Sequence, residues 1–218
     1  MALVLYGHPF SSYCQKVEIA LYENALPFEL RVLDPDHAEH LAEWTRLWPL
    51  KKMPVLVDSG RCVVESSIII EHLHLRHRGP VALLPDDPAE ALEVRFMDRF
   101  FDNHVMAEMQ RPVFEALRPG GRKDEALLHA ATALDTSYGW LEQRLQGRTW
   151  AAGEDFSMAD CAAAPALFYA DWVHPISDSF PGVRAYRTRL LARPAFARAV
   201  DGGRPFRHWF PLGAPDRD

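Results

Sequence analysis

The sequence contains no apolar run long enough to cross a bilayer, which takes roughly 18 residues, so we expect no transmembrane helix. Its first residues lack both a basic start and a long apolar stretch, and no signal peptide is expected. Cysteine is scarce, and three such residues far apart cannot build a disulfide framework. An odd cysteine count without a signal is typical of a reducing compartment, so the sequence predicts a cytoplasmic protein.

Clustered positive charge is also missing. The 24 lysines and arginines are outnumbered by 30 acidic residues, and they often sit beside acids, as in FMDRFFD at 96–102. Nucleic acids and anionic membranes bind clustered positive charge, so neither partner is expected. The length of 218 residues is enough for one large domain or two small ones. Apolar residues make up 48% of the chain, so a sizeable core can be buried.

The first part of the chain, residues 1–78, alternates between strand and helix patterns in the order βαβαββα. The first βαβ unit should be a right-handed crossover with parallel strands. In its first helix, the polar residues Lys16 and Glu18 lie between apolar positions, as expected for an amphipathic helix with a polar face. The expected elements are strands at 3–6, 28–33, 55–57 and 63–64, and helices at 12–23, within 34–49 and from Ser66, which should cap its helix.

A linker is expected at 79–88, because GPVALLPDDP carries three prolines and one glycine. Residues 89–218 then show only helical patterns and predict an all-helical C-terminal domain. In the first of these helices, Leu92, Phe96, Phe100 and Asn103 fall on one stripe. The helical patterns cover 89–117, 124–146, 157–172, 181–192 and 194–201.

The segment GHPFSSYCQKV at 7–17 places Ser11 and Ser12 where a strand turns into a helix. Free backbone N–H groups and the helix dipole favour an anion there, and a thiolate is the natural candidate. A charge-assisted hydrogen bond contributes ~1.5–3 kcal/mol and one pKa unit corresponds to ~1.4 kcal/mol, so one hydroxyl could lower a bound thiol's pKa by roughly one to two units. The alternative is that one serine only caps the helix.

Two further junctions could bind the rest of such a ligand. Pro54 begins a strand and donates no backbone hydrogen bond, which could leave the backbone of Met53 free to pair with an extended ligand. Glu65, Ser66 and Ser67 begin a helix, where N–H groups and hydroxyls suit a carboxylate and Glu65 suits an ammonium group. Glu65, Ser66 and Ser67 together would recognise a ligand that carries both groups, an α-amino acid. An ordinary strand start and an ordinary helix cap are the alternatives.

Residues 1–78 resemble the thioredoxin-like domain of the cytosolic glutathione S-transferases, in element order and in the segments SSYCQKV, KKMPVLV and VVESSIIIEHL. The second half resembles the family's all-helical domain, with the capping pair Ser157 and Asp160 in GEDFSMADCAAAP. The resemblance implies an α/β thioredoxin-like N-terminal domain followed by an all-α helical bundle. It also implies glutathione as a substrate, no metal, and a homodimer in which the third helix of the first domain meets the partner's helix from about residue 89.

For the site, the resemblance implies that Ser11 matches the catalytic serine of the theta- and zeta-like branches, with Ser12 as the adjacent candidate. Tyr6 ranks lower, because an offset of one residue along a strand points its side chain to the opposite face. The glutathione-binding residues implied are Met53 before a cis Pro54, Glu65, Ser66 and Ser67 at the γ-glutamyl end, and Lys52 and His40 at the glycyl carboxylate. The hydrophobic second substrate would meet Phe10, His8, Met106, Met109 and Trp172, and the aromatic tail at 206–210 could close over it.

The predicted function is conjugation of the glutathione thiolate to a hydrophobic electrophile. Three alternatives stay open: a zeta-type glutathione-dependent isomerase acting on a maleyl compound, a thiol–disulfide or dehydroascorbate reductase using Cys14, and a non-catalytic interaction module. Burial as an inert thiol is the expected fate of Cys14, and Cys62 and Cys161 should be structural. His72, His74 and His77 should form a solvated helix face, because their spacing does not put three metal ligands on one side.

Overall fold

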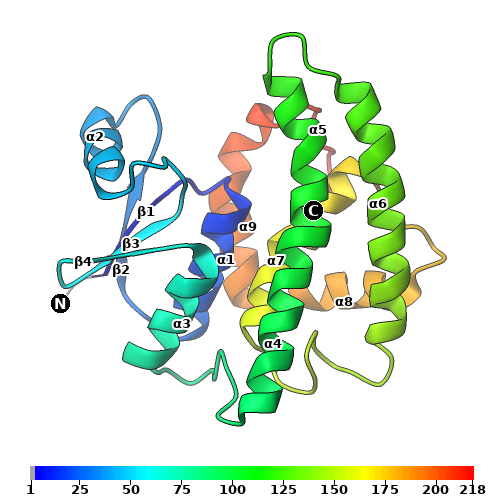
Figure 1. Cartoon of the computed structure of the whole chain (residues 1–218), viewed down its shortest axis with the longest axis horizontal. Helices are drawn as coiled ribbons and strands as arrows, with labels where there is room; N and C mark the ends of the chain where they lie inside the picture. The colour runs from blue at the N-terminus through cyan, green and yellow to red at the C-terminus, as the bar shows by residue number, and fades with distance from the viewer. Residues whose placement is uncertain (1–2) are drawn as a thin grey trace.

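The computed structural model describes residues 3–218, and its N-terminal part, up to Arg76, has the predicted order βαβαββα, followed by helices (Figure 1). The N-terminal elements are β1 (Leu3–Gly7), α1 (Ser12–Glu23), β2 (Phe28–Val32), α2 (Ala38–Leu47), β3 (Val55–Asp58), β4 (Arg61–Val64) and α3 (Ser66–Arg76). The C-terminal elements are α4 (Pro88–Phe100), the π-helix η1 (Phe101–Met106), α5 (Ala107–Leu117), α6 (Lys123–Arg144), α7 (Met158–Val173), α8 (Pro181–Leu191), α9 (Pro194–Gly203) and the 3₁₀ helix η2 (Arg204–Trp209). The predicted thioredoxin-like domain and helical domain are thus confirmed.

The sheet has the strand order β2-β1-β3-β4. β1 and β2 are parallel, as the predicted crossover requires, and β3 is antiparallel to both β1 and β4. Leu5 and Leu56 face each other across β1 and β3, and both are fully buried in the core. Ser59 and Gly60 join β3 to β4 with positive φ at both positions, the backbone of a tight hairpin turn.

Helix α1 lies at the centre of the molecule rather than on its surface. It packs between the N-terminal elements and helices α7 and α9 of the other domain, as Figure 1 shows. As a result Lys16 and Glu18, expected on the polar side of an amphipathic helix, are almost fully buried. The prediction of an exposed polar face is wrong for α1, because Lys16 pairs with Asp98 and Asp102 of the helical domain and Glu18 lies near Arg198 of α9.

The helical domain begins with a well-capped helix. The Asp87 side chain accepts hydrogen bonds from the backbone N–H groups of Ala89 and Glu90, and Pro88 occupies the first helical position. Helix α4 continues through the π-helix η1 into α5 as one long rod (Figure 1). On the predicted stripe, Phe100 is buried, whereas Leu92 and Phe96 are exposed.

Helix α7 begins with the predicted capping pair. The Ser157 backbone N–H donates to Asp160 Oδ2 at 2.9 Å, and the Tyr186 hydroxyl and the Ala151 N–H donate to Oδ1 at 2.5 and 2.9 Å. Both members of the pair are buried, so they anchor α7 inside the domain. Within residues 3–218 no helix combines the length and the apolar character that a membrane crossing requires.

Candidate active site

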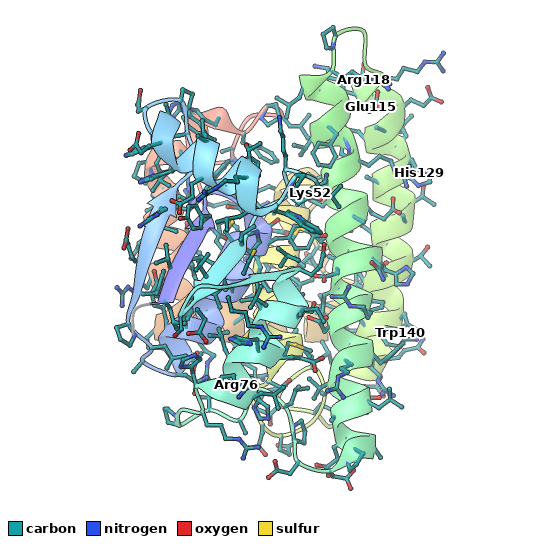
Figure 2. The ribbon with its side chains drawn as sticks, turned by 60° about the vertical axis from the view of Figure 1, so that its left-hand side comes forward. Lys52, Arg76, Glu115, Arg118, His129 and Trp140 are labelled. Carbon is teal, nitrogen blue, oxygen red and sulfur yellow. The ribbon has the colours of Figure 1, made fainter. Side chains whose placement is uncertain are left out.

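A cleft of about 690 Å³ lies between the two domains. The loop before β3 and the start of α3 form one wall, and α4, η1 and α5 form the other. Figure 2 shows Lys52 on the side of the N-terminal domain that faces α4 and α5. The cleft contains six predicted glutathione-binding residues: Lys52, Met53, Pro54, Glu65, Ser66 and Ser67.

The loop before β3 reaches the cleft through a bend at Pro54. The Met53–Pro54 peptide bond is cis. Strand pairing of β3 begins at Val55, so Met53 lies just beyond the hydrogen-bonded part of the sheet. The Lys52 carbonyl accepts a hydrogen bond from Trp44 Nε1 at 3.1 Å, which holds this loop against α2. Met53 therefore presents backbone next to the cleft, where an extended peptide could pair with it.

The start of α3 differs from the predicted cap at Ser66. Glu65 is the N-cap residue and Ser66 is the first helical residue, and no side chain caps this helix start. Its first N–H groups are therefore available to a carboxylate on the ligand. Glu65 has φ 68, a left-handed conformation that is uncommon without glycine and that proteins concentrate at functional sites.

Ser11 is the N-cap of α1, as the helix-cap alternative predicted. Its Oγ accepts a hydrogen bond from the Cys14 backbone N–H at 3.4 Å. That bond uses a lone pair, so the hydroxyl proton is still available to an anion. Ser12 is buried. Neither serine is among the residues that border the cleft, and the catalytic role of both stays a prediction.

Tyr13, which the sequence did not single out, borders the cleft directly. Burial raises the pKa of its phenol to about 12, and the charge of Asp102 adds to this effect. The hydroxyl therefore keeps its proton near neutral pH and can act as a hydrogen-bond donor. Trp48 and Phe114 are further aromatic side chains at the cleft. Tyr13 directly follows Ser12 in the sequence, and this position beside the serine pair is the signal that could have identified it.

A buried network of charges joins the two domains at the base of the cleft. Lys16 Nζ lies 2.6 Å from Asp98 Oδ1 and 2.8 Å from Asp102 Oδ2, and it donates to Ser67 Oγ at 2.9 Å. The Ser67 hydroxyl in turn donates to Asp98 Oδ2 at 2.7 Å, and Arg99 binds both carboxylates. Ser67 is thus engaged between the domains. The segment FMDRFFD, in which charges of both signs stand side by side, supplies the two aspartates and Arg99 of this network.

His8 is packed beneath the C-terminal aromatic tail. Its ring stacks on Trp209 with centroids 5.0 Å apart and meets Phe206 edge-on at 4.5 Å. The Phe10 backbone N–H donates to His8 Nδ1 at 3.1 Å. Burial lowers the pKa of His8, which favours the neutral ring. The aromatic tail at 206–210, which was predicted to close over the second substrate, therefore packs directly on His8.

The other predicted contacts of the second substrate lie in the core. Phe10 packs against Trp172 with ring centroids 6.3 Å apart, and Trp172 is largely buried. Met106 and Met109 are also buried, and none of these four borders the cleft between the domains. Their contact with a substrate stays a prediction.

Tyr6 and His40 also lie away from the cleft. The Tyr6 hydroxyl accepts a hydrogen bond from Arg31 Nη1 at 2.6 Å, and burial raises its pKa to about 12. This agrees with its low rank as a nucleophile activator. One His40 ring nitrogen lies 3.0 Å from the Val32 carbonyl oxygen, and the ring stacks on His37.

Cys14 is fully buried, which confirms the expected inert thiol. Burial raises its pKa to about 12, and the His8 backbone N–H donates to its sulfur at 3.4 Å. A side chain at Gly7 would place its Cβ 2.6 Å from that sulfur, so this position requires glycine. Cys161 is likewise buried, whereas Cys62 is exposed on β4, and its expected structural role stays a prediction.

Comparisons with known proteins agree with this architecture. The family model for the glutathione S-transferase N-terminal domain matches residues 5–81, and the model for the C-terminal domain matches residues 96–194. FtsZ-localized protein A of Caulobacter vibrioides is 33% identical, over 88% of each chain. Glutathione transferase GST 23 of Zea mays is 32% identical, over 81% of this chain and 79% of the maize protein.

A probable maleylacetoacetate isomerase of Vibrio cholerae is 28% identical, over 94% of this chain and 98% of the bacterial protein. Both domain models match in the expected order and together cover most of the chain. The cleft lies between the two matched domains. This chain belongs to the glutathione S-transferase family.

Proposed function

We propose that the protein binds glutathione in the cleft between its domains and joins the glutathione sulfur to an electrophilic carbon. The observation that carries this proposal is the convergence of two separate segments, 52–54 and 65–67, on one cleft. Each segment offers groups that match one part of the tripeptide.

Recognition of the peptide follows from the geometry of those segments. The uncapped N–H groups at Ser66 would bind the γ-glutamyl carboxylate, and the Glu65 carboxylate would bind its ammonium group. The backbone of Met53 would pair with the cysteinyl unit. Lys52, which is exposed at the mouth of the cleft, would bind the glycyl carboxylate.

The chemical step needs an ionised sulfur. Ser11 and Ser12, at the positive end of α1, would donate hydrogen bonds to the thiolate, and Tyr13 is a third donor beside them. The thiol proton leaves to solvent and the thiolate forms a bond to the electrophilic carbon. With an aromatic halide, the halide departs with its bonding electron pair. With an unsaturated carbonyl compound, the electron pair of the C=C π bond moves to the adjacent carbon, which takes up a proton from solvent. The protein supplies proximity and electrostatic stabilisation and forms no covalent intermediate.

Calorimetric titration with glutathione, followed by a panel of aromatic halides and unsaturated carbonyl compounds, tests this proposal. We expect heat of binding, product formation and weaker binding in Glu65→Ala, with Glu29→Ala on β2 as the matched control. A maleyl compound in the panel tests the isomerase alternative, because isomerisation consumes no glutathione. Absence of heat at about millimolar glutathione, a concentration that would detect even binding of roughly -4 kcal/mol, contradicts the proposal.

A second candidate function is a non-catalytic role in which the protein associates with FtsZ. The observation that favours it is the 33% identity with FtsZ-localized protein A over 88% of each chain. Co-sedimentation with purified FtsZ polymers tests it directly. Binding to FtsZ without any glutathione binding favours the assembly role, whereas glutathione binding with no co-sedimentation favours the enzyme.

We further propose that the protein acts as a cytoplasmic homodimer. Four large apolar side chains are exposed on the two helices that the resemblance assigns to the dimer interface: Ile68 and Leu75 on α3, and Leu92 and Phe96 on α4. Trp140 on α6 extends this surface, because its ring packs edge-on against Phe96 with centroids 5.8 Å apart. We call these five residues the apolar face.

A further inference from the structure

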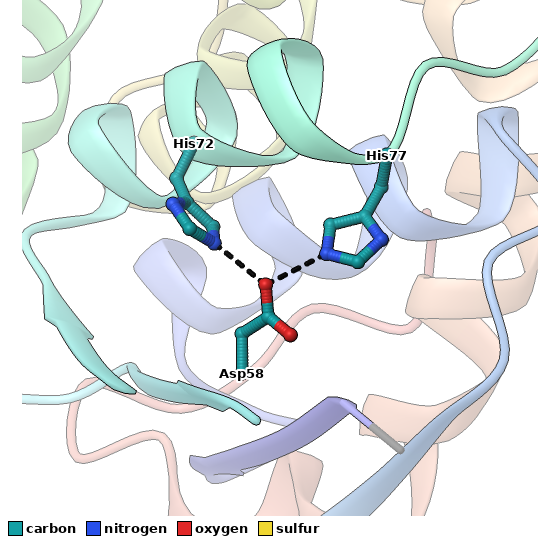
Figure 3. A group of neighbouring side chains, drawn as sticks. All are labelled: Asp58, His72 and His77. Atoms are coloured by element: carbon teal, nitrogen blue, oxygen red, sulfur yellow. Dashed lines mark hydrogen bonds and ion pairs between the residues drawn. The ribbon is translucent and has the colours of Figure 1, made fainter. Parts of the chain in front are cut away.

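Three side chains converge at the end of β3, away from the cleft. The same carboxylate oxygen of Asp58, Oδ2, lies 2.8 Å from Nε2 of His72 and 2.7 Å from Nε2 of His77 (Figure 3). Asp58 is the last residue of β3, His72 lies in α3, and His77 directly follows α3. The three ligand atoms all lie within 4.8 Å of one another.

The expectation of a solvated histidine face is wrong for this pair, and the chain geometry explains why. Residues five apart on an α-helix do not share a face. The helix ends at Arg76, however, and His77 has φ -136 and ψ 52, so the backbone turns and brings its ring back beside His72. The third group comes from the hairpin rather than from the helix. Sequence spacing within α3 could not show it.

The chemistry of the cluster is that of a metal site. Two imidazoles and one carboxylate are ligands that Zn²⁺ accepts, at about 2.0–2.2 Å, with a water completing the tetrahedron. Such ligands lie about 3.3 Å apart around zinc, so the two N–O contacts would widen by about 0.5 Å. Each imidazole can carry its proton on Nδ1, which leaves Nε2 free to bind the metal.

The surroundings of the cluster favour a bound cation. The side chains of His72 and Asp58 are only 10% and 12% exposed and that of His77 is 28% exposed, so the three groups are largely held in place. With neutral histidines, the cluster carries one negative charge.

We propose that Asp58, His72 and His77 bind one Zn²⁺ ion per chain. Asp58 lies four residues along β3 from Pro54, about 13 Å at strand spacing, so the ion is distant from the cleft and serves structure. It would fasten the β3–β4 hairpin to the end of α3. Both elements continue into walls of the cleft, since β3 follows the loop with Met53 and α3 begins at Ser66.

The test titrates the chelator-treated full-length protein with Zn²⁺ by calorimetry and with Co²⁺ by visible absorption. We expect one ion per chain, a tetrahedral Co²⁺ spectrum and a higher melting temperature with Zn²⁺. His72→Ala and His77→Ala should each weaken binding at least about tenfold. His74→Ala is the matched control, because His74 lies on the same helix outside the cluster, and it should bind as the unmodified chain does.

A second measurement needs no variant and so does not depend on how the variants fold. Zn²⁺ should protect the imidazoles of His72 and His77 in the unmodified protein from acylation by diethyl pyrocarbonate, with His74 as the internal reference. No binding by either titration shows a hydrogen-bonded ion pair only and overturns the proposal. Binding that is unchanged in His72→Ala and His77→Ala places the ion elsewhere and overturns the proposal too. The same holds if Zn²⁺ protects His74 from acylation as strongly as it protects His72 and His77.

Discussion

At the scale of single residues, the most informative side chains are polar groups buried on α1. Glu18 is almost fully buried, and its Oε1 has no hydrogen-bond partner among the described residues. Burial raises the pKa of this carboxyl from 4.5 to about 7, partly offset by the charge of Arg198. The folded chain therefore holds a proton that the unfolded chain has released, and the two states respond differently to pH.

This difference predicts a pH-dependent stability. The folded protein binds more protons than the unfolded chain between pH 4.5 and about 7, so its free energy of unfolding should fall as pH rises through that window. Glu18→Gln removes the titration and should be more stable than the unmodified chain by about 3 kcal/mol near pH 8, but not near pH 4. Urea denaturation at both pH values measures this. Equal stability differences at the two pH values, or the same result in the exposed Glu39→Gln control, would contradict the assignment.

Ser11 has two separable roles, capping α1 and supporting a thiolate. Ser11→Ala removes the cap and should lower the free energy of unfolding by about 0.5–2 kcal/mol. Ser11→Asp restores a cap acceptor but places a negative charge beside the sulfur, so stability should recover while the pKa of bound glutathione rises. Thermal unfolding and the ultraviolet absorbance of the thiolate measure the two effects. If Ser11→Asp keeps an unchanged thiolate signal, Ser12 or Tyr13 is the donor.

At the scale of elements, local patterns predicted most of the fold. The alternation of strand and helix signals, the prolines at 79–88 and the capping pair at 157–160 are local features, and local features persist in the folded chain. The burial of the polar residues of α1 could not be predicted in this way. Elements from both domains cover this helix. A polar side chain can be buried there because a residue far along the chain pairs with it, as Asp98 pairs with Lys16.

The same distinction applies to the cleft. The segments 52–54 and 65–67 were recognisable because each carries its chemistry within three residues. The cleft wall formed by α4, η1 and α5 was not recognisable in the sequence. Its lining residues are spaced singly along one long helical rod, and the orientation of that rod depends on tertiary packing. Met106 and Met109 on this rod are buried in the core, and their predicted contact with a substrate stays a prediction.

The network around Lys16 predicts strong coupling between α1 and α4. The Lys16 side chain is only 1% exposed, and removing it leaves Asp98 and Asp102 facing each other with Arg99 alone to compensate. Breaking a buried ion pair on one side typically costs about 3–5 kcal/mol, so Lys16→Met should lower the free energy of unfolding by that amount.

The control for this prediction is Arg95→Met, which removes an exposed pair with Glu71 at 2.8 Å and should cost less than about 1 kcal/mol. Denaturant titration followed by circular dichroism compares the two variants. A loss in Lys16→Met no larger than in Arg95→Met would mean that the network does not hold the domains together. Recovery in the double variant Lys16→Met with Asp102→Asn would indicate that the unpaired carboxylate causes the loss.

At the scale of the whole molecule, the apolar face predicts how two copies meet. Its residues lie on α3, α4 and α6, so they belong to both domains, and the rings of Phe96 on α4 and Trp140 on α6 pack against each other. Phe96→Glu would bury a charge in the interface without a partner, at a cost of several kcal/mol, and should convert the dimer to a monomer at micromolar concentration. Leu128→Glu is the matched control, because Leu128 is exposed on α6 about 18 Å along the helix from Trp140. Sedimentation velocity should give a dimer for the control and a monomer for Phe96→Glu, whereas a monomer for the unmodified chain, or a dimer for both variants, would exclude this face.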